Sequence, residues 1–164
     1  MTYYCQYPSP VGSLLLTSDG NDLTGLFMDR EPPVGAEAAE DLQVLRQTKD
    51  WLDAYFRGTP PDWLPPMMPA GTAFQKLIWQ YLLEIPFGEV RTYGALAQRA
   101  AEDMGKQRMS AQAVGGAVGR NPISIIIPCH RCVGAGGSLT GYAWGLERKR
   151  WLLQHEQEKG AKQK

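Results

Sequence analysis

The sequence predicts an α+β protein with a small N-terminal α/β domain and a helical C-terminal domain. Clusters of β-forming residues precede residue 30, and helical periodicity begins at about residue 72. Between these regions, the stretch from Thr59 to Pro69 holds five prolines, which have no backbone N–H to donate and exclude regular structure. We therefore predict domains at 1–70, including this linker, and at 71–158, followed by a basic tail at 159–164.

The first domain is predicted to contain a β-hairpin and one helix. Three segments are rich in β-forming residues: 3–8, 12–18 and 23–28. The sequence Ser18-Asp19-Gly20-Asn21 between the last two is typical of a hairpin turn. Residues from about 37 to 57 have helical spacing of apolar side chains, and Gly58 and Pro60 end the pattern. The domain shows no catalytic constellation, so we interpret it as a scaffold.

The second domain is predicted to begin with a capped helix. Thr72 and Gln75 have the Thr-x-x-Gln spacing of a capping box, and apolar residues then recur at helical spacing as far as Leu82. Pro86 and Gly88 end this helix.

Two shorter helices follow. Thr92 can cap one through about Glu102, and Ser110 can cap another through about Gly119. Two short helices beside a basic flank are typical of a helix-turn-helix, although an ordinary helical hairpin has the same pattern.

The last of these helices has an unusually small set of side chains: Ala111, Ala113, Gly115, Gly116 and Ala117. Glycine within a helix costs about 1 kcal/mol relative to alanine, so two in succession need a reason. One reason is close packing against another helix. The other is entry into a DNA minor groove, which is only about 6 Å wide.

The net charge of zero conceals an asymmetry. Residues 1–90 hold 5 basic and 12 acidic residues, net −7, and residues 91–164 hold 12 basic and 5 acidic, net +7. A basic half favours a polyanionic partner, because Lys and Arg displace phosphate counterions. Charge matching between the two domains and a solvated tail at Lys159, Lys162 and Lys164 are the alternatives.

Other classes are disfavoured by composition. The chain has no apolar run of about 18 residues that could span a membrane and no visible secretory signal. Its three cysteines are too few for a disulfide framework. We therefore expect a cytoplasmic protein without a membrane partner.

A candidate nucleophile lies near the C-terminus. The apolar run 123–127 is predicted to be a buried strand or extended segment, and Pro128, Cys129 and His130 follow it. A thiolate is the reactive form of cysteine, and an ordinary thiol has a pKa of about 8.5, so an adjacent base would help. The alternative is a buried structural thiol beside a surface histidine.

A second thiol gives the spacing Cys129-x-x-Cys132, which alone suggests redox chemistry or half of a zinc site. Tetrahedral zinc needs two more ligands, and Cys5, His130 and His155 offer no second paired spacing. We expect no metal here.

An ordered set of short motifs extends from Phe74 to Glu156, about half of the chain. The motifs are Phe74-Gln75 with Ile78-Trp79, Ile85-Pro86-Phe87-Gly88-Glu89-Val90, Thr92-Tyr93, Ala113-Val114-Gly115-Gly116-Ala117, Asn121-Pro122, Ile127-Pro128-Cys129-His130-Arg131, Gly141-Tyr142, and Lys149 with Leu152-Leu153 and Glu156. In this order they resemble the catalytic domain of the O6-alkylguanine-DNA alkyltransferases, the methylated-DNA–protein-cysteine methyltransferases.

The resemblance implies a ribonuclease H-like N-terminal domain and a winged-helix-like C-terminal domain. It implies that a monomer binds double-stranded DNA containing O6-alkylguanine, flips the nucleotide from the minor groove, and transfers the alkyl group to Cys129 without a cofactor. Because nothing in the motif could hydrolyse the resulting thioether, each molecule would act once.

The resemblance also implies roles for individual residues. His130, held by Glu156, would deprotonate Cys129 through a water, and Tyr93, assisted by Lys149, would donate a proton to the departing base. A bridging water suits neighbouring residues of an extended chain, whose side chains point to opposite faces. The expected pocket residues are Tyr142, Ala143, Trp144 and Cys132. The expected DNA-binding residues are Gln112, Ala113, Gly115, Asn121, Arg120, Arg108 and Arg131, with a structural role as the alternative for Arg131. His155 is expected at the surface.

The chain departs from the family pattern at three places. Gln112 replaces the usual arginine that fills the space left by the flipped base, so we hypothesise that Lys106 or Arg108 restores phosphate affinity. The spacer from Tyr93 to Gln112 is longer than usual. Trp144 replaces a residue that is small in many members and predicts a narrow pocket that favours methyl over benzyl adducts.

Two other functions remain open from the sequence. One is a non-catalytic binder of alkylated DNA. The presence of the candidate nucleophile Cys129 disfavours this function, whereas Gln112 in place of the usual arginine is compatible with it. The other is a thiol oxidoreductase using Cys129 and Cys132, which the absence of a thioredoxin-like βαβ context disfavours.

Overall fold

The computed structural model describes residues 1–162, and the chain forms two compact units. The first unit comprises Met1–Ala70 together with Pro122–Ser124, and the second comprises Gly71–Asn121 and the chain from Ile125 onward. The first unit is therefore completed by a short segment that lies just before the candidate nucleophile in sequence.

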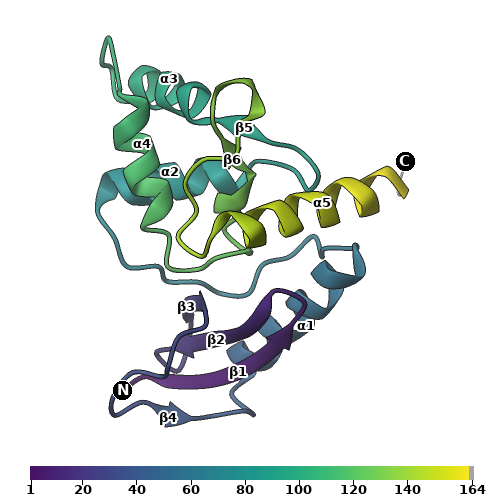
Figure 1. Ribbon diagram of the computed structural model, residues 1–164. Helices are drawn as coiled ribbons and strands as arrows, with labels where there is room; N and C mark the ends of the chain where they lie inside the picture. The colour runs from purple at the N-terminus through teal and green to yellow at the C-terminus, as the bar shows by residue number, and fades with distance from the viewer. Residues whose placement is uncertain (163–164) are drawn as a thin grey trace. The chain divides into compact units, whose positions relative to one another are not determined.

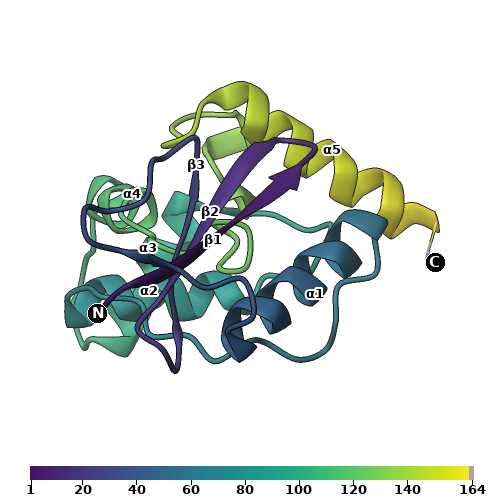
Figure 2. The same ribbon diagram turned by 90° about the horizontal axis from the view of Figure 1, so that it is seen from below.

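The first unit is a four-stranded sheet with one helix. Strands β1 (Tyr3–Ser9), β2 (Gly12–Ser18) and β3 (Leu23–Met28) form an antiparallel meander, and β4 (Glu37–Ala38) pairs parallel to β1, giving the order β3-β2-β1-β4. Helix α1 (Gln43–Arg57) lies alongside β1 and β2 (Figures 1 and 2). Leu14, Leu15 and Leu16 of the central strand are all buried, so this strand contributes to the core on both faces.

The helix predicted from residue 37 begins later, at Gln43. Glu37 and Ala39 donate backbone hydrogen bonds to Thr2 (2.9 Å) and Tyr4 (2.9 Å), so pairing with β1 satisfies this segment as a strand. Helix α1 ends where expected, at Gly58, whose φ of 91° is the left-handed conformation typical of a glycine cap.

Two short segments lie along the outer edge of β3. The backbone N–H groups of Leu23 and Met68 bond to Pro66 and Leu23 (2.7 and 2.8 Å), so part of the proline-rich stretch is fixed beside the strand. Leu26 similarly donates to Pro122 (2.9 Å) and accepts from Ser124 (3.2 Å). Proline is tolerated here because the edge of a sheet does not require its missing donor.

Within the described residues, the second unit contains four α-helices, two short 3-10 helices and a two-stranded parallel sheet. The helices are α2 (Ala73–Leu83), α3 (Tyr93–Asp103), α4 (Ala111–Gly119) and α5 (Leu146–Lys162), and the strands are β5 (Arg91–Thr92) and β6 (Cys132–Val133). The predicted caps Thr72, Thr92 and Ser110 each accept a backbone N–H bond from the first helical turn. Helices α3 and α4 pack together as the helix-turn-helix (Figure 1).

Helix α5 continues through Lys159 to Lys162, where a separate tail was expected from residue 159. The last two residues of that expected tail lie outside the described residues.

The apolar run 123–127 is not a strand, which corrects the sequence prediction. Only Ile123 forms a β-bridge, to Leu26, and the chain then turns through Ser124–Ile126. Ile125 has a φ of 69°, a conformation that β-branched residues rarely adopt. The burial of Ile125, Ile126 and Ile127 offsets this backbone strain, because three large apolar side chains leave water together.

Candidate active site

A short 3-10 helix, Cys129–Arg131, positions the candidate nucleophile. The N–H of Cys129 bonds to the carbonyl of Ile127 (2.8 Å) and that of Arg131 to the carbonyl of Pro128 (2.9 Å). The extended conformation expected for Cys129 and His130 is therefore wrong. Their side chains still diverge, since successive residues of a 3-10 helix point about 120° apart.

Glu156 of α5 is bound by two side chains of this turn. His130 Nε2 lies 2.5 Å from Glu156 Oε2, and Arg131 donates to both carboxylate oxygens, from Nε at 2.7 Å and Nη2 at 3.2 Å. The backbone N–H of Gly88 adds a fourth contact at 3.0 Å, and Arg131 Nη1 donates to the carbonyl of Ile85 at 2.7 Å. All three side chains are buried, so this cluster fixes the turn to α5.

These contacts set the protonation states of the pair. Burial alone would raise the pKa of Glu156, but the His130 and Arg131 contacts outweigh it and hold the pKa well below its usual value. Burial lowers the pKa of His130 more than Glu156 raises it, so the imidazole is neutral near pH 7. An ionised carboxylate only accepts hydrogen bonds, so Nε2 carries the proton and Nδ1 holds the free lone pair. Among the described residues Nδ1 has no hydrogen-bond partner, and it is buried.

Cys129 is a buried free thiol surrounded by groups that favour its anion. Burial raises its pKa, while a hydrogen bond from Asn121, the charge of Lys149 and the nearby Tyr142 hydroxyl oppose this increase. That hydroxyl is buried and has no hydrogen-bond partner among the described residues, so its proton is available to a thiolate. The pKa of Tyr142 is raised well above its usual value by burial and by Cys129, so its hydroxyl keeps the proton that it can donate to sulfur. The resting sulfur is therefore a thiol, with donors already arranged around it.

Asn121 connects the end of α4 to this turn. Its Nδ2 donates to the carbonyl of Ile127 (2.8 Å), and its side chain also bonds to Cys129. Only 8% of its surface is exposed. Asn121 thus connects the helix-turn-helix to the nucleophile turn and leaves little surface for the direct DNA contact expected from the sequence.

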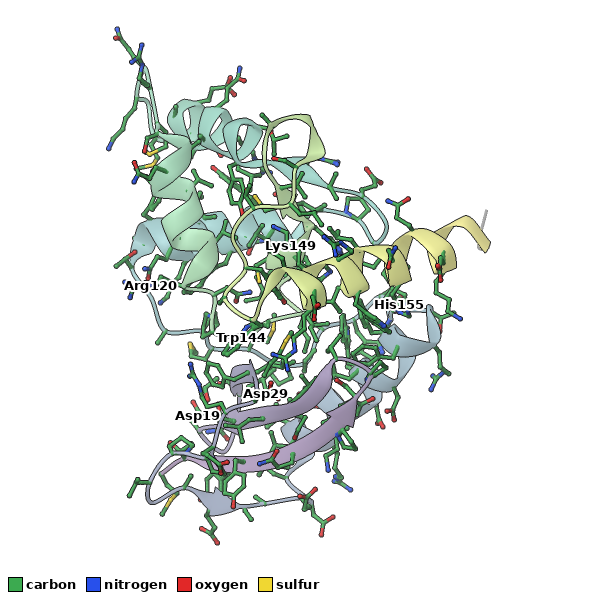
Figure 3. The ribbon with its side chains drawn as sticks, viewed as in Figure 1. Asp19, Asp29, Arg120, Trp144, Lys149 and His155 are labelled. Carbon is green, nitrogen blue, oxygen red and sulfur yellow. The ribbon has the colours of Figure 1, made fainter. Side chains whose placement is uncertain are left out.

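Lys149 holds the loop that precedes α5. Its Nζ donates to the carbonyls of Cys132 (2.7 Å), Thr140 (3.0 Å) and Gly141 (3.3 Å), which matches the three donors of an ammonium group. Burial lowers its pKa. Figure 3 shows Lys149 on α5, and Trp144 in the segment that leads into this helix.

Tyr93, at the start of α3, shares two of these acceptors. Its hydroxyl bonds to the carbonyls of Thr140 (3.2 Å) and Gly141 (3.4 Å), and its ring centroid lies 5.7 Å from Lys149 Nζ. Burial and the neighbouring thiols raise its pKa to about 12, so it stays protonated. A Cβ on Gly115 would lie 3.9 Å from the Tyr93 ring, so α4 approaches this ring closely.

The expected pocket residues differ in exposure. Tyr142 and Trp144 are half-buried and Ala143 is exposed. Cys132 is fully buried, and burial raises its pKa to about 12, which disfavours thiol exchange at this sulfur. Cys132 contributes to the site through its backbone carbonyl, which accepts a hydrogen bond from Lys149.

The expected DNA-binding residues also divide into two groups. Gln112, Ala113, Arg120 and Arg108 are exposed, and Gly115 is half-buried. Arg131 is 7% exposed and its guanidinium is occupied by Glu156 and Ile85, which contradicts a phosphate contact and supports the structural alternative.

Several features of the site were not predicted. His155 is buried rather than at the surface: its ring stacks on Trp151 at 5.0 Å and meets Phe87 edge-on at 6.2 Å. Four residues contribute to the site through backbone N–H or C=O groups, which the identity of the side chain does not predict: Ile85, Gly88, Thr140 and Gly141. Gly88 offers a partial signal, because its φ of 86° favours glycine.

Among residues 1–162, no cluster of three or more His, Cys, Asp or Glu side chains could hold a metal ion. In the same range, no helix is long and apolar enough to cross a membrane.

Known proteins resemble the chain over almost its whole length. Residues 73–158 match the DNA binding domain of 6-O-methylguanine DNA methyltransferase, and residues 2–63 match its ribonuclease-like domain. A methylated-DNA–protein-cysteine methyltransferase of Haemophilus influenzae is 46% identical over 158 residues, covering 94% of this chain and 86% of that protein. One from Methanosarcina acetivorans is 42% identical over 157 residues, covering 94% and 97%.

A solved structure supports the same assignment. The crystal structure of Mycobacterium tuberculosis OGT in complex with DNA matches with a TM-score of 0.83 and 40% identity, over 96% of this chain and 94% of that one. With both domains matched in order and relatives at this identity, the chain belongs to the 6-O-methylguanine DNA methyltransferase family.

Proposed function

We propose that this protein repairs DNA by transferring the alkyl group of O6-alkylguanine to its own Cys129, once per molecule. The observation that carries the proposal is the arrangement of Cys129, His130 and Glu156. A buried thiol adjoins a neutral histidine whose Nε2 is fixed by an ionised carboxylate, so that Nδ1 can accept a proton. The relatives carry names that state methyl transfer from DNA to a protein cysteine.

The first step is proton transfer from Cys129 Sγ to His130 Nδ1 through one bridging water, because Nδ1 makes no direct hydrogen bond within the described residues. The negative charge of Glu156 stabilises the imidazolium that forms. Donors from Asn121 and Tyr142 and the charge of Lys149 stabilise the thiolate, which the buried site would otherwise disfavour.

The thiolate then attacks the alkyl carbon, forming a carbon–sulfur bond as the bond to guanine O6 breaks. The electron pair leaves with guanine, which needs a proton. Tyr93 is the donor that we assign, because its raised pKa keeps it protonated at the pocket wall. The phenolate left on Tyr93 recovers a proton through solvent as His130 releases the one it took from Cys129, so the protons balance and the thioether on Cys129 remains.

We propose that α4 is the helix that enters the DNA minor groove. Its exposed residues Gln112, Ala113 and Gly116 are small or neutral, and a Cβ on Gly116 would meet nothing within 4 Å, so the surface is open. Guanine O6 is out of reach within the stacked duplex, so the nucleotide must be flipped out. Gln112 lies near the start of the helix, where it can occupy the space that a flipped nucleotide leaves.

We further propose that the protein acts as a cytoplasmic monomer.

The test is intact-mass spectrometry after incubation with a duplex that carries one O6-methylguanine. Wild-type protein is expected to gain the mass of one methylene group, saturating at one per molecule, while Cys129→Ser gains none. Duplex binding without a mass gain would instead support a non-catalytic lesion binder.

A further inference from the structure

We infer that the loop between α3 and α4 is a second DNA contact, in which Lys106 and Arg108 bind phosphates beside the groove that α4 enters. This inference rests on the proposed function, because it assumes that α4 faces DNA. It assigns to this loop the phosphate affinity that a neutral Gln112 does not supply.

The loop projects from the helix-turn-helix. After α3 ends at Asp103, Gly105 adopts a φ of 65°, and the N–H of Lys106 bonds back to the carbonyl of Ala101 (2.8 Å). This cap stops the helix and redirects the chain. Figure 1 shows the segment between α3 and α4 as a narrow projection that extends beyond both helices.

The two basic side chains on this projection are free to bind a ligand. Lys106 and Arg108 are both exposed, and within the described part of the chain neither forms an ion pair or a side-chain hydrogen bond. Figure 3 shows nitrogen-bearing side chains pointing outward from the tip.

Two carboxylates near the base of the loop reduce its positive potential to different extents. Asp103 accepts a hydrogen bond from the Tyr81 hydroxyl and lies 3.9 Å from Arg99 Nε, but Arg99 also pairs with Glu84 at 2.6 Å, so the charge of Asp103 is partly compensated. Glu102 is exposed and lines the same shallow depression as Lys106 and Arg108. Its charge therefore opposes phosphate binding by the loop.

The placement of these cations relative to α4 suits a helix in a narrow groove. Helix α4 has no Lys or Arg from Ala111 to Gly119, and Arg108 and Arg120 are the first cations beyond its two ends. At 1.5 Å per residue the helix is about 13 Å long, which exceeds the roughly 6 Å width of the minor groove. Small residues can therefore occupy the groove while the cations at the two ends reach the phosphates beside it.

The distance along the chain permits this arrangement. Arg108 precedes Gln112 by four residues, so even a fully extended chain keeps their Cα atoms within about 14 Å. Phosphates recur along one strand about every 3.4 Å of helix axis, so several lie within this range.

The experiment measures how the affinity for an undamaged duplex depends on salt, for wild type and for Lys106→Gln/Arg108→Gln. Each lost phosphate contact is expected to reduce the slope of log K against log [salt] by about 0.9, so the double variant should lose about 1.8. If this contribution vanishes near 1 M salt, the same slope change corresponds to roughly 30-fold weaker binding at 0.15 M.

The matched control is Arg150→Gln/Lys159→Gln, which removes two positive charges from α5, and it should keep the wild-type slope. Glu102→Gln removes the opposing charge and should strengthen binding severalfold. An unchanged slope in the loop variant, or an equal change in the α5 control, would overturn the inference.

Reaction with the free base O6-methylguanine separates this inference from the proposed function, since it does not need DNA binding. The loop variant should react at the wild-type rate, which also shows that it is folded. If wild type itself fails to methylate Cys129, the proposed function fails whatever the salt slopes are.

Discussion

Replacing Glu156 by Gln should impair both the stability and the chemistry of this protein. The carboxylate is 1% exposed and contacts His130 at 2.5 Å and Arg131 at 2.7 Å, so the variant leaves a buried guanidinium without its counter-charge. Removing one partner of a buried ion pair typically costs about 3–5 kcal/mol. Because Gln keeps an oxygen that can accept one of these hydrogen bonds, we expect a loss of about 3 kcal/mol.

The chemical effect has a separate cause. Glu156 fixes the His130 tautomer that leaves Nδ1 free and stabilises the imidazolium, so its loss should reduce general-base catalysis. Such catalysis contributes on the order of 10²–10⁴-fold, and the transfer rate should fall within that range. Single-turnover reaction with free O6-methylguanine measures the rate, and urea unfolding followed by tryptophan fluorescence measures the stability.

Glu158→Gln is the matched control, because it makes the same change on an exposed side chain of the same helix. It should alter stability by less than about 0.5 kcal/mol and leave the rate unchanged. The pH dependence adds a second signature. A lowered folded-state pKa gives stability that is fully present above the ordinary Glu pKa, about 4.3, and that is lost progressively as the pH falls from there through the folded-state pKa. The stability gap between wild type and Glu156→Gln should therefore narrow below about pH 4. A Glu156→Gln protein as stable and active as Glu158→Gln would show that the buried carboxylate neither compensates Arg131 nor activates His130.

Three further predictions concern the same pocket. Because burial lowers the folded-state pKa of His130, the transfer rate to free base should be flat near neutral pH and decline only below about pH 6.5, and a decline centred above pH 7 would contradict this. Trp144→Ala should raise the rate with O6-benzylguanine about tenfold or more relative to O6-methylguanine, measured as a ratio of single-turnover rates, whereas Trp63→Ala in the first unit should leave the ratio unchanged. Lys149→Gln should destabilise the protein by about 3 kcal/mol in urea unfolding, because three carbonyls share one ammonium group, and the exposed Lys76→Gln should cost less than about 0.5 kcal/mol.

The sequence predicted best those features that local chemistry determines. Thr72, Thr92 and Ser110 cap their helices because a hydroxyl followed by an apolar helical pattern has few alternatives. The hairpin turn at Ser18–Asn21 was predicted for the same reason. The family resemblance supplied the pairing of His130 with Glu156, which lie 26 residues apart and carry no local signal.

The sequence predicted poorly where tertiary contacts override local preference. The isoleucine run has the composition of a strand, yet Ile125 turns at a positive φ because its neighbours gain more from burial than the backbone loses. The sequence predicts His155 at the surface, because no pattern indicates that Trp151 and Phe87 enclose it. The carbonyls that hold Lys149 come from two separate segments, which only the folded chain brings together.

The position of the transferred methyl group shows directly whether Cys129 is the acceptor. Wild-type protein would react with O6-methylguanine duplex, and fragmentation of the peptide spanning Cys129 and Cys132 would identify the modified sulfur. We expect S-methylation at Cys129 alone, unchanged in Cys132→Ser and absent in Cys129→Ser. Methylation at Cys132, or a methylated product in Cys129→Ser, would contradict the claim that Cys129 is the acceptor.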